Sequence, residues 1–449
     1  MGGGLMQLVA YGAQDIYLTG NPQITFFKVV YRRHTNFSME AIQQTFNGNV
    51  AVGGSTVTST ISRNGDLVSN LWLDVVMPKV STKVVGIDAD KHTGTYINWV
   101  NNTGHALIKE CELEIGGQRI DRHYGHWLDI QNELYDHDEK DWIGLNKHSA
   151  KKPYLLSGPH GDAVSPKLFK LYVPLKFWFC DNPGLALPLI ALQYHEVKIR
   201  LTTRGMLGLI NTDADIDNPA AVPTVQLWAD YIYLDTDERR RFAQVSHEYL
   251  IEQVQRETGS TATTKKLNFN HPIKELIWVV QDNTRITENN STDTGTITGS
   301  AHSINPLIAP PWFGGIGRHV KNDYFNYTAN DTGDIEDIAG QHSVESFDTL
   351  RLKLNGHDRF APRKASYFRT CQPQQAGHKI PSKHIYSYSF ALKPEEHQPS
   401  GTCNFSRIDN ASLNFTFGTT PSASTITIYA INYNVLRIMS GMGGLAYSN

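Results

Sequence analysis

Hydrophobic and polar residues alternate along much of the chain, which is the pattern of a β-sheet with one buried face. Runs of β-branched and aromatic residues, bounded by turn-forming residues, predict the strands. The clearest of these runs are residues 71–77, 169–179, 197–201, 228–234 and 425–433. Helical periodicity is scarce. We expect helices over 127–135 and over 235–244, where Asp235 and Asp237 supply an N-cap and early negative charge.

The two halves of the chain repeat one another. Five segments of the first half each have a similar segment in the second half, in the same order. These pairs are 71–76 with 276–280, 113–122 with 352–360, 171–177 with 385–392, 194–201 with 409–415, and 228–234 with 426–433. The loops between them differ in length, as surface insertions do. We therefore expect two copies of one β-domain.

Glycine-containing pairs mark a tight turn in each half. Gly116-Gly117 and Asn355-Gly356 each lie between two short strand-like runs. A two-residue hairpin turn needs positive φ at its central residues, a conformation that glycine and asparagine adopt most easily. Both segments are therefore predicted to be β-hairpins.

About eight strands in each half, spaced for Greek-key connections, indicate two sheets packed face to face. The expected fold is all-β: two consecutive eight-stranded jelly rolls (a double jelly roll) with long surface loops. The loops are expected at segments rich in Thr, Asn, Asp and Gly, over 284–305 and 327–341. The expected division is a flexible N-terminal arm over 1–26, a first jelly-roll domain over 27–236, a short helical linker over 237–246 and a second jelly-roll domain over 247–449.

Composition narrows the classes of function. With 449 residues, of which 40% are hydrophobic, the chain can build about two or three domains. Its formal net charge of -3 gives no field that attracts nucleic acid, so direct nucleic-acid binding is not expected. The four cysteines lack C-x-x-C spacing, which fits a reducing compartment. A signal-peptide pattern and a membrane-spanning apolar run are both missing, so we expect synthesis in the cytoplasm.

The motifs of common enzymes are incomplete. His195-Glu196 and His247-Glu248 are each followed by isoleucine where a zinc protease places its second histidine. Neither a phosphate-binding G-x-x-x-x-G-K-[S/T] nor a nucleophile-bearing G-x-S-x-G occurs. The glycine cluster at 313–318 is interpreted as a loop, and 213–218 begins like a calcium loop but lacks its glycine and glutamate. We predict no catalytic residue, no cofactor-binding residue and no cofactor.

Histidine is abundant, at eighteen residues, so a metal site was considered. His123 and His126 flank a Tyr-Gly pair, and His137 lies among acidic residues. A cupin needs two histidines separated by one residue, and this spacing does not occur. We interpret these histidines as part of a surface loop or as hydrogen-bonded, and predict no metal site.

Two basic clusters could contact phosphate or protein. Arg32-Arg33-His34 follows the expected arm, and we interpret it as a polar contact to a partner protein. The arginines at 239–241 are expected to pair within their own helix with Asp235, Asp237 and Glu238.

Several segments resemble the major capsid proteins of nucleocytoplasmic large DNA viruses, the iridovirus, phycodnavirus and marseillevirus group. The segment 231–253, YIYLDTDERRRFAQVSHEYLIEQ, is similar to the interdomain signature of that family. Further similar segments are the opening 1–40, the strands at 268–281, the stretch 386–407 and the ending 433–447. They follow the family order along the whole chain. The loops 82–94 and 284–341 resemble nothing in the family.

The resemblance implies a structural protein and not an enzyme. Its members form homotrimers with a hexagonal outline, and these capsomers tile the icosahedral shell of a double-stranded DNA virus. The resemblance further implies that the N-terminal arm meets minor capsid proteins on the inner face, and that outer loops face the host. Any internal viral membrane would be contacted indirectly. The implied location is the virion capsid, assembled in the host cytoplasm.

The alternative from another class is a jelly-roll carbohydrate-binding protein or glycoside hydrolase. A hydrolase needs two carboxylates roughly 5–10 Å apart across a groove, and the sequence leaves that spacing open. A lectin needs exposed aromatic residues on loops, for which Trp142 and Trp312-Phe313 are available. Trimers and particle association favour the capsid interpretation, whereas glycan binding by an isolated monomer favours the alternative.

Overall fold

The structure is a computed structural model of the chain. It describes residues 21–23, 27–29, 33–51, 53–78, 97–100, 102–135, 170–212, 222–282, 324–325, 327, 345–417 and 424–447. The expected loops at 82–94 and 284–305, and residues 328–341, lie outside these ranges. The chain forms two compact units, Met1–Phe37 and Ser38–Asn449, and all the sheets belong to the second apart from Phe37, the first residue of β1.

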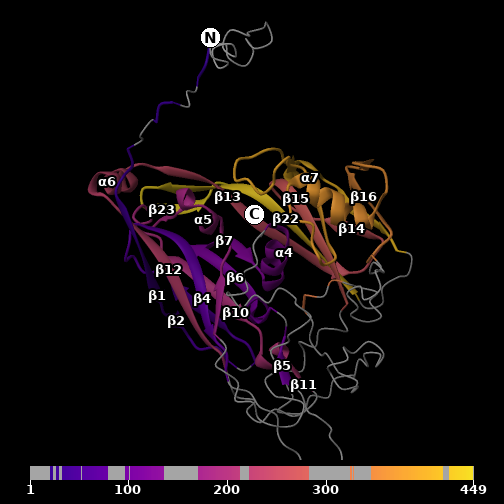
Figure 1. Ribbon diagram of the computed structural model, residues 1–449, viewed down its shortest axis with the longest axis horizontal. Coiled ribbons are helices and arrows are strands. Elements are labelled where there is room, and N and C mark those ends of the chain that lie inside the picture. Colours follow the sequence, from indigo (N-terminus) through magenta and orange to yellow (C-terminus); the bar gives the residue numbers. More distant parts are fainter. Residues whose placement is uncertain are drawn as a thin grey trace, which may run out of the picture. The chain divides into compact units, whose positions relative to one another are not determined.

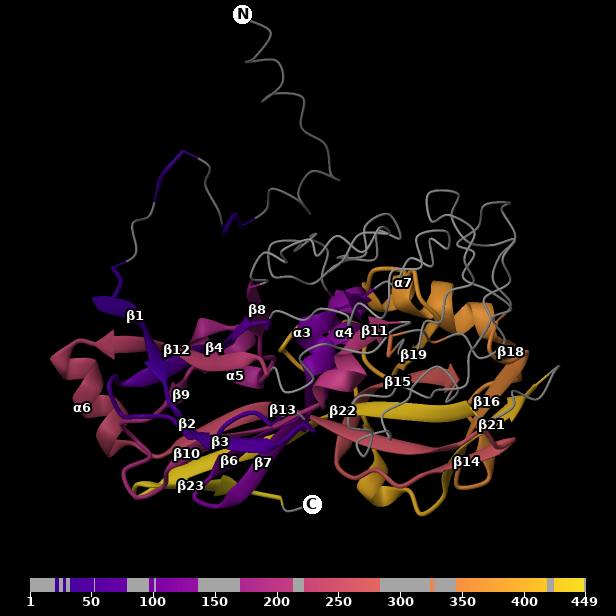
Figure 2. The ribbon, with the colours of Figure 1, turned by 90° about the horizontal axis from the view of Figure 1, so that it is seen from below.

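The first half builds two facing sheets (Figures 1 and 2). One has the order β1-β12-β4-β8, with β9 beside β4, and the other has the order β2-β3-β10-β6-β7. A separate ribbon pairs β5 with β11. The bounds are β1 Phe37–Gln44, β2 Phe46–Asn47, β3 Thr56–Thr60, β4 Leu67–Val76, β5 Ile97–Trp99, β6 Ile108–Ile115, β7 Gln118–His123, β8 Lys170–Pro174, β9 Leu187–Pro188, β10 Val197–Thr203, β11 Ile210–Thr212 and β12 Thr224–Leu234.

The second half builds a second sandwich. Its sheets have the orders β13-β22-β15-β19, with β20 beside β15 and β23 beside β22, and β14-β21-β16-β17, with β18 beside β16. The bounds are β13 His247–Ser260, β14 Thr264–Leu267, β15 Pro272–Asp282, β16 Thr349–Leu354, β17 His357–Asp358, β18 Arg363–Lys364, β19 Ile385–Ser389, β20 Cys403–Asn404, β21 Ala411–Thr416, β22 Ser424–Met439 and β23 Met442–Leu445.

The strand orders confirm the internal repeat. In both sandwiches the pairs of similar segments occupy the same position, because β4 corresponds to β15, β8 to β19, β10 to β21 and β12 to β22. The β6–β7 hairpin likewise corresponds to β16–β17. Antiparallel sheets connected in this Greek-key order are jelly rolls, so the fold is the predicted double jelly roll.

Both predicted hairpin turns are confirmed. Ile115 pairs with Gln118 across the first turn, and Leu354 pairs with His357 across the second. The central residues have positive φ: 58° and 81° at Gly116 and Gly117, and 49° and 83° at Asn355 and Gly356. This geometry follows the right-handed twist of the flanking strands, which explains the glycine in each turn.

One strand prediction was too long. The run 169–179 was expected to be extended throughout, but β8 ends at Pro174 and a short helix, α5 (Trp178–Asp181), follows. Proline has no N–H to continue the ladder, which accounts for the end of the strand. The aromatic residues beyond it, Phe177 and Phe179, are buried in the core from this turn instead.

The two predicted helices are confirmed. The first is α4, Gly125–Tyr135, and the second is α6, Thr236–Gln244, where the Asp235 carboxylate accepts a hydrogen bond from Thr236 N at 2.8 Å. The other short helical elements are α3 Thr103–Leu107, α7 Gln372–Ala376, the 3₁₀ turns Pro183–Leu185, Met206–Leu209 and Phe405–Arg407, and the π turn Tyr367–Cys371. No helix in the described ranges is long and apolar enough to span a membrane.

The sheet containing β15 and β22 is buried on both faces. Along β15, Ile277 and Val279 pack into the core shared with the first half, whereas Leu276 and Trp278 pack into the core of the second half. This double burial explains why the segment 276–280 is apolar without alternation. The strand β22 runs across both sandwiches and reaches the first core at its C-terminal end (Figures 1 and 2).

The two hairpin glycines are expected to differ in their tolerance of alanine. Around Gly356 an added Cβ meets nothing within 4 Å, so Gly356→Ala introduces only the strain of positive φ, about 1 kcal/mol. At Gly116 the added Cβ also collides with the ring of His195, whose Nδ1 lies 2.9 Å from Gly443 O. Gly116→Ala is therefore expected to cost about 3 kcal/mol. Equal shifts of the two urea midpoints would contradict this account.

Candidate functional site: the seam between the two jelly rolls

Helix α4 carries the first part of the seam between the two jelly rolls (Figure 2). Its apolar residues Trp127, Ile130 and Leu134 are buried in the shared core. Asp129 and Glu133 lie one turn apart on the helix, so both reach the same neighbour. That neighbour is the segment 379–383 of the second half, since Lys379 N donates to Leu134 O at 3.0 Å.

Asp129 is the most heavily bonded carboxylate of the seam. It is 2% exposed, and Lys383 Nζ lies 2.8 Å from each of its oxygens. The Tyr327 hydroxyl donates to Oδ2 at 2.9 Å and the Asn102 amide donates to Oδ1 at 2.6 Å. Burial alone would raise the pKa of Asp129, but Lys383 and these donors outweigh it and hold the pKa below the usual value. Asp129 is therefore an ionised group joined to the second half.

Glu133 continues the contact one turn further along the helix. Its Oε1 accepts a hydrogen bond from Ser382 N at 2.8 Å and another from the Ser382 hydroxyl. The side chain is buried although its partners are neutral. Two donors on one oxygen satisfy part of the hydrogen-bonding demand of the carboxylate.

A second buried group surrounds His378. Its Nε2 lies 2.8 Å from Glu275 Oε1, and its Nδ1 lies 2.7 Å from Glu395 Oε1. The Tyr135 hydroxyl at the end of α4 donates to Glu275 Oε2 at 2.9 Å. Burial would lower the pKa of His378, but the two carboxylates outweigh it and raise the pKa to about 9. The imidazole is therefore a buried cation at neutral pH.

Strand β13 completes the seam. Lys274 is 2% exposed, and its Nζ lies 2.6 Å from Glu252 Oε2 and 2.7 Å from Pro394 O. Asp121 of β7 accepts a hydrogen bond from Val254 N at 3.2 Å, so the edge of the first jelly roll meets β13. The guanidinium of Arg256 lies 3.5 Å above the ring of Tyr124. The contacts of Asp121 and Tyr124 with β13 join the two halves at this position, whereas the Lys274 pair lies within the second half.

Three histidines of the first half lie beside this seam: His105 in α3 and His123 at the end of β7, which are buried, and His126 in α4, which is half-buried. Their burial lowers the pKa values to about 4, 3 and 3. Within the described residues, both ring nitrogens of His123, Nδ1 of His105 and Nε2 of His126 lack a hydrogen-bond partner. His126 packs edge-on against Phe325, at 5.7 Å between ring centroids.

The interpretation as surface-loop or hydrogen-bonded residues was therefore wrong for His123, which is fully buried against Phe177 at the end of β7. His126 lies in helix α4 and not in a loop, half-buried against Phe325 and Tyr327. His137 lies outside the described residues. Among the described residues, no group of three or more His, Cys, Asp or Glu side chains is arranged to hold a metal ion.

The remaining sequence candidates are dispersed. His195 contacts Gly443 of the C-terminal hairpin, and His247 Nε2 lies 2.8 Å from Phe242 O. Arg239 was expected to pair within its helix, but its Nε lies 2.7 Å from Asp66 Oδ1 of the first jelly roll. Asp66 directly precedes strand β4, and Arg239 pairs with it instead of with the acidic residues of its own helix. His34 Nδ1 lies 3.0 Å from Thr35 O.

Several candidates lie outside the described residues. They are Arg32, Trp142, Trp312-Phe313, the calcium-like segment 213–218 and the glycine cluster 313–318.

The seam residues were missed in the sequence. A signal was present, because Lys274-Glu275 interrupts the apolar strand β15 and Asp129 and Glu133 lie on the apolar side of α4. Charges inside a buried element need partners.

Removal of one seam charge is expected to destabilise the chain. Asp129→Asn leaves the Lys383 ammonium beside a neutral amide, and we expect a loss of about 3 kcal/mol. The double variant Asp129→Asn with Lys383→Met removes the uncompensated charge and is expected to recover part of this. Lys393→Met at an exposed ion pair is the control, with no measurable loss expected. Denaturant unfolding measures the free energy of unfolding of all three variants. An unchanged free energy of unfolding in Asp129→Asn would contradict the prediction.

The buried histidines are expected to make the fold sensitive to acid. His126 stays neutral in the folded chain down to a pKa of about 3, whereas an unfolded histidine takes up a proton near pH 6.5. Protons therefore favour the unfolded chain as the pH falls below 6.5, by about 2 kcal/mol per histidine at pH 5. His126→Phe is expected to reduce the loss of stability between pH 7.5 and pH 5 by that amount. An unchanged pH profile of the melting temperature would contradict it.

Two family models match this chain: "Major capsid protein N-terminus" over residues 25–235, and "Large eukaryotic DNA virus major capsid protein" over residues 238–444. The major capsid protein of Pyramimonas orientalis virus is 47% identical over 477 residues, covering the whole of both chains.

Solved structures agree. A chain of the quasi-atomic model of the PBCV-1 virus capsid is 39% identical with a TM-score of 0.71, covering 95% of this chain and 100% of that one. The Faustovirus major capsid protein, at 14% identity and a TM-score of 0.67, covers 96% of this chain and 94% of its own, and supports the fold alone. The models and the relative cover nearly the whole double jelly roll, so the chain belongs to the family of large eukaryotic DNA virus major capsid proteins, the structural proteins of the virion capsid.

Proposed function

We propose that three copies of the chain form a homotrimeric capsomer with a pseudo-hexagonal outline, and that these capsomers tile the icosahedral shell. The observation that carries the proposal is the pair of sandwiches with the same strand order, fused through one continuous core. Closed rotational symmetry is the common arrangement of identical subunits. Three copies of two similar lobes then present six similar sides to their neighbours.

The surface of the chain supports lateral contacts. Large apolar side chains are exposed on the single chain, among them Tyr194 at 76% and Leu392 at 78%. Exposed apolar residues of this size gain free energy when a second subunit covers them. A permanent interface of this class buries ~2,000–5,000 Å². Contacts between capsomers can be weaker, because many act together in a shell.

The remaining parts of the proposal concern organisation and partners. We propose an N-terminal arm over 1–26 that meets minor capsid proteins on the inner face, jelly-roll domains over 27–236 and 247–449, and a linker over 237–246. Outer loops would face the host, and an internal membrane would be reached indirectly. Assembly is proposed in the host cytoplasm, without direct nucleic-acid binding and without catalysis. The relatives described above are capsid proteins, so the carbohydrate-binding and hydrolase alternative gains no support.

The assembly is tested by the mass of the purified chain. Light scattering is expected to give three times 50.3 kDa, with pseudo-hexagonal particles in negative-stain images of the same peak. Deletion of residues 1–26 is expected to leave the number of subunits at three. The same deletion is expected to remove binding to minor capsid proteins. A stable monomer of the full chain, in the presence of any folding partner, would contradict the trimer.

A further inference from the structure

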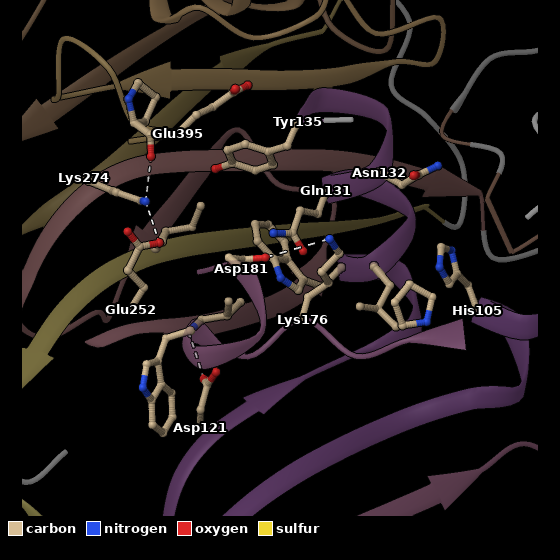
Figure 3. A pocket seen from close by; sticks show the side chains of 17 residues that line it. His105, Asp121, Gln131, Asn132, Tyr135, Lys176, Asp181, Glu252, Lys274 and Glu395 are labelled. Atoms are coloured by element: carbon tan, nitrogen blue, oxygen red, sulfur yellow. Dashed lines mark hydrogen bonds and ion pairs between the residues drawn. The ribbon is translucent and has the colours of Figure 1, made fainter. Parts of the chain in front are cut away.

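A cavity of about 320 Å³ lies in the seam, between the two jelly rolls (Figure 3). Its walls come from helix α4, from the turn after β8, and from β13 and β15 of the second half. Its volume equals that of roughly ten water molecules, which is enough for a small organic ligand. Ligand sites form preferentially where two domains meet.

The walls combine apolar and aromatic side chains with polar and charged ones. Trp127, Leu128 and Tyr135 of α4 lie along one side, with Trp178 of α5 and Ile431 of β22 also in the lining. Trp127 is 2% exposed and Trp178 is 4% exposed, so both rings are held by the surrounding core. Aromatic faces attract both apolar groups and cations.

The charges of the cavity are not balanced. Four carboxylates face two lysines in the lining, and three of those carboxylates already have a cation. These ion pairs are Glu252 with Lys274 at 2.6 Å, Asp181 with Lys176 at 3.9 Å, and Glu395 with His378 at 2.7 Å.

The fourth carboxylate is Asp121. Its Oδ1 accepts hydrogen bonds from the backbone N–H groups of Arg122 and Val254, at 2.8 Å and 3.2 Å. Within the described part of the chain, no lysine, arginine or histidine side chain forms an ion pair with it. Glu252, from the other half, repels it, and Arg122 attracts it less strongly. Asp121 is therefore a buried carboxylate at a cavity wall, and a buried carboxylate requires a cation to be stable as an anion.

Two further polar atoms in the lining lack partners. Gln131 Oε1 is buried, and neither it nor His105 Nδ1 has a hydrogen-bond partner within the described residues. His105 is 2% exposed. Buried polar atoms are nearly always hydrogen-bonded, so these two atoms are expected to bond to whatever fills the cavity, water or a ligand.

We propose that this cavity binds a small organic amine, with its ammonium group on the Asp121 carboxylate and its apolar body against Trp127 and Trp178. An ammonium with an aromatic or alkyl body fits the carboxylate and the rings together, whereas a metal ion leaves the rings unused. The ligand contacts both jelly rolls, so its binding stabilises their junction.

The pH dependence of binding follows from Asp121. Burial raises its pKa to about 7, against the two backbone hydrogen bonds that lower it. The carboxylate is then about one-tenth ionised at pH 6 and about nine-tenths ionised at pH 8, and the amine binds the ionised form. We expect about tenfold tighter binding at pH 8 than at pH 6. The charged and titratable groups that surround Asp121 and the cavity are His105, Arg122, Lys176, Asp181, Glu252, Lys274 and Glu395.

The test uses phenethylamine as the probe and phenethyl alcohol as its neutral counterpart, with the full chain in calorimetric titration. The amine is expected to bind with a Kd of about 1 mM at pH 8 and about 10 mM at pH 6. The alcohol is expected to bind at least tenfold more weakly than the amine at pH 8, without a pH dependence.

Variants locate the site. Asp121→Asn is expected to weaken amine binding at pH 8 at least tenfold. Asp358→Asn, at an exposed carboxylate of β17, is the matched control and is expected to bind normally. Equal binding of amine and alcohol, binding that survives Asp121→Asn, or no saturable binding at either pH would overturn the proposal; the last result means that water alone fills the cavity. If Asp121→Asn fails to fold, the comparison of the two probes at the two pH values decides.

Discussion

A buried charge must meet an opposite charge, and this requirement determines how the two jelly rolls join. Asp129, Lys274 and Glu275 are each at most 2% exposed, and each is matched by a bonded partner. Asp129 reaches across the seam to Lys383. If one half slid past the other by a single residue, Asp129 would lose Lys383 and Glu275 would lose the Tyr135 hydroxyl, while both carboxylates stayed buried. The polar contacts thus specify the arrangement, whereas the apolar contacts around them supply most of the free energy.

The apolar contribution comes from a sheet that serves two cores. Successive residues of β15 and β22 enter the core of the second half and the shared core in turn. A sheet covered on both faces has little freedom to bend, and the long ladder from His247–Ile438 to Ser260–Thr425 stiffens it further. The two sandwiches therefore behave as one body. A capsid subunit built in this way transmits force from one jelly roll to the other without a hinge.

Local rules predicted much of this fold from the sequence. Asn355-Gly356 and Gly116-Gly117 determine their own turns, because the need for positive φ involves only neighbouring residues. The repeat predicted matching strands, because both halves pack two sheets with the same strand order. The end of β8 at Pro174 was missed because the apolar run continues past it, and the period alone does not distinguish a strand from a buried turn.

The contacts between the two jelly rolls could not be predicted from the sequence, for a different reason. Asp129 and Lys383 are separated by 254 residues, and Glu133 and Ser382 by 249, so neither sequence neighbourhood reveals its partner. The pattern could show that Lys274-Glu275 was unusual inside β15, but not what would neutralise it. The burial of His123 was missed for the same reason, because the sequence does not reveal which surfaces cover this residue.

The path of β22 has a consequence for synthesis on the ribosome. Leu436 and Ile438, near the end of the chain, belong to the core of the first jelly roll, and β23 is anchored there through His195. A nascent chain that has emerged only as far as the linker lacks these side chains, so its first domain remains unfinished until β22 has been synthesised. A prematurely terminated product exposes that gap to chaperones and proteases. The fold thereby makes the N-terminal domain depend on a strand, β22, that is synthesised about 200 residues after the linker.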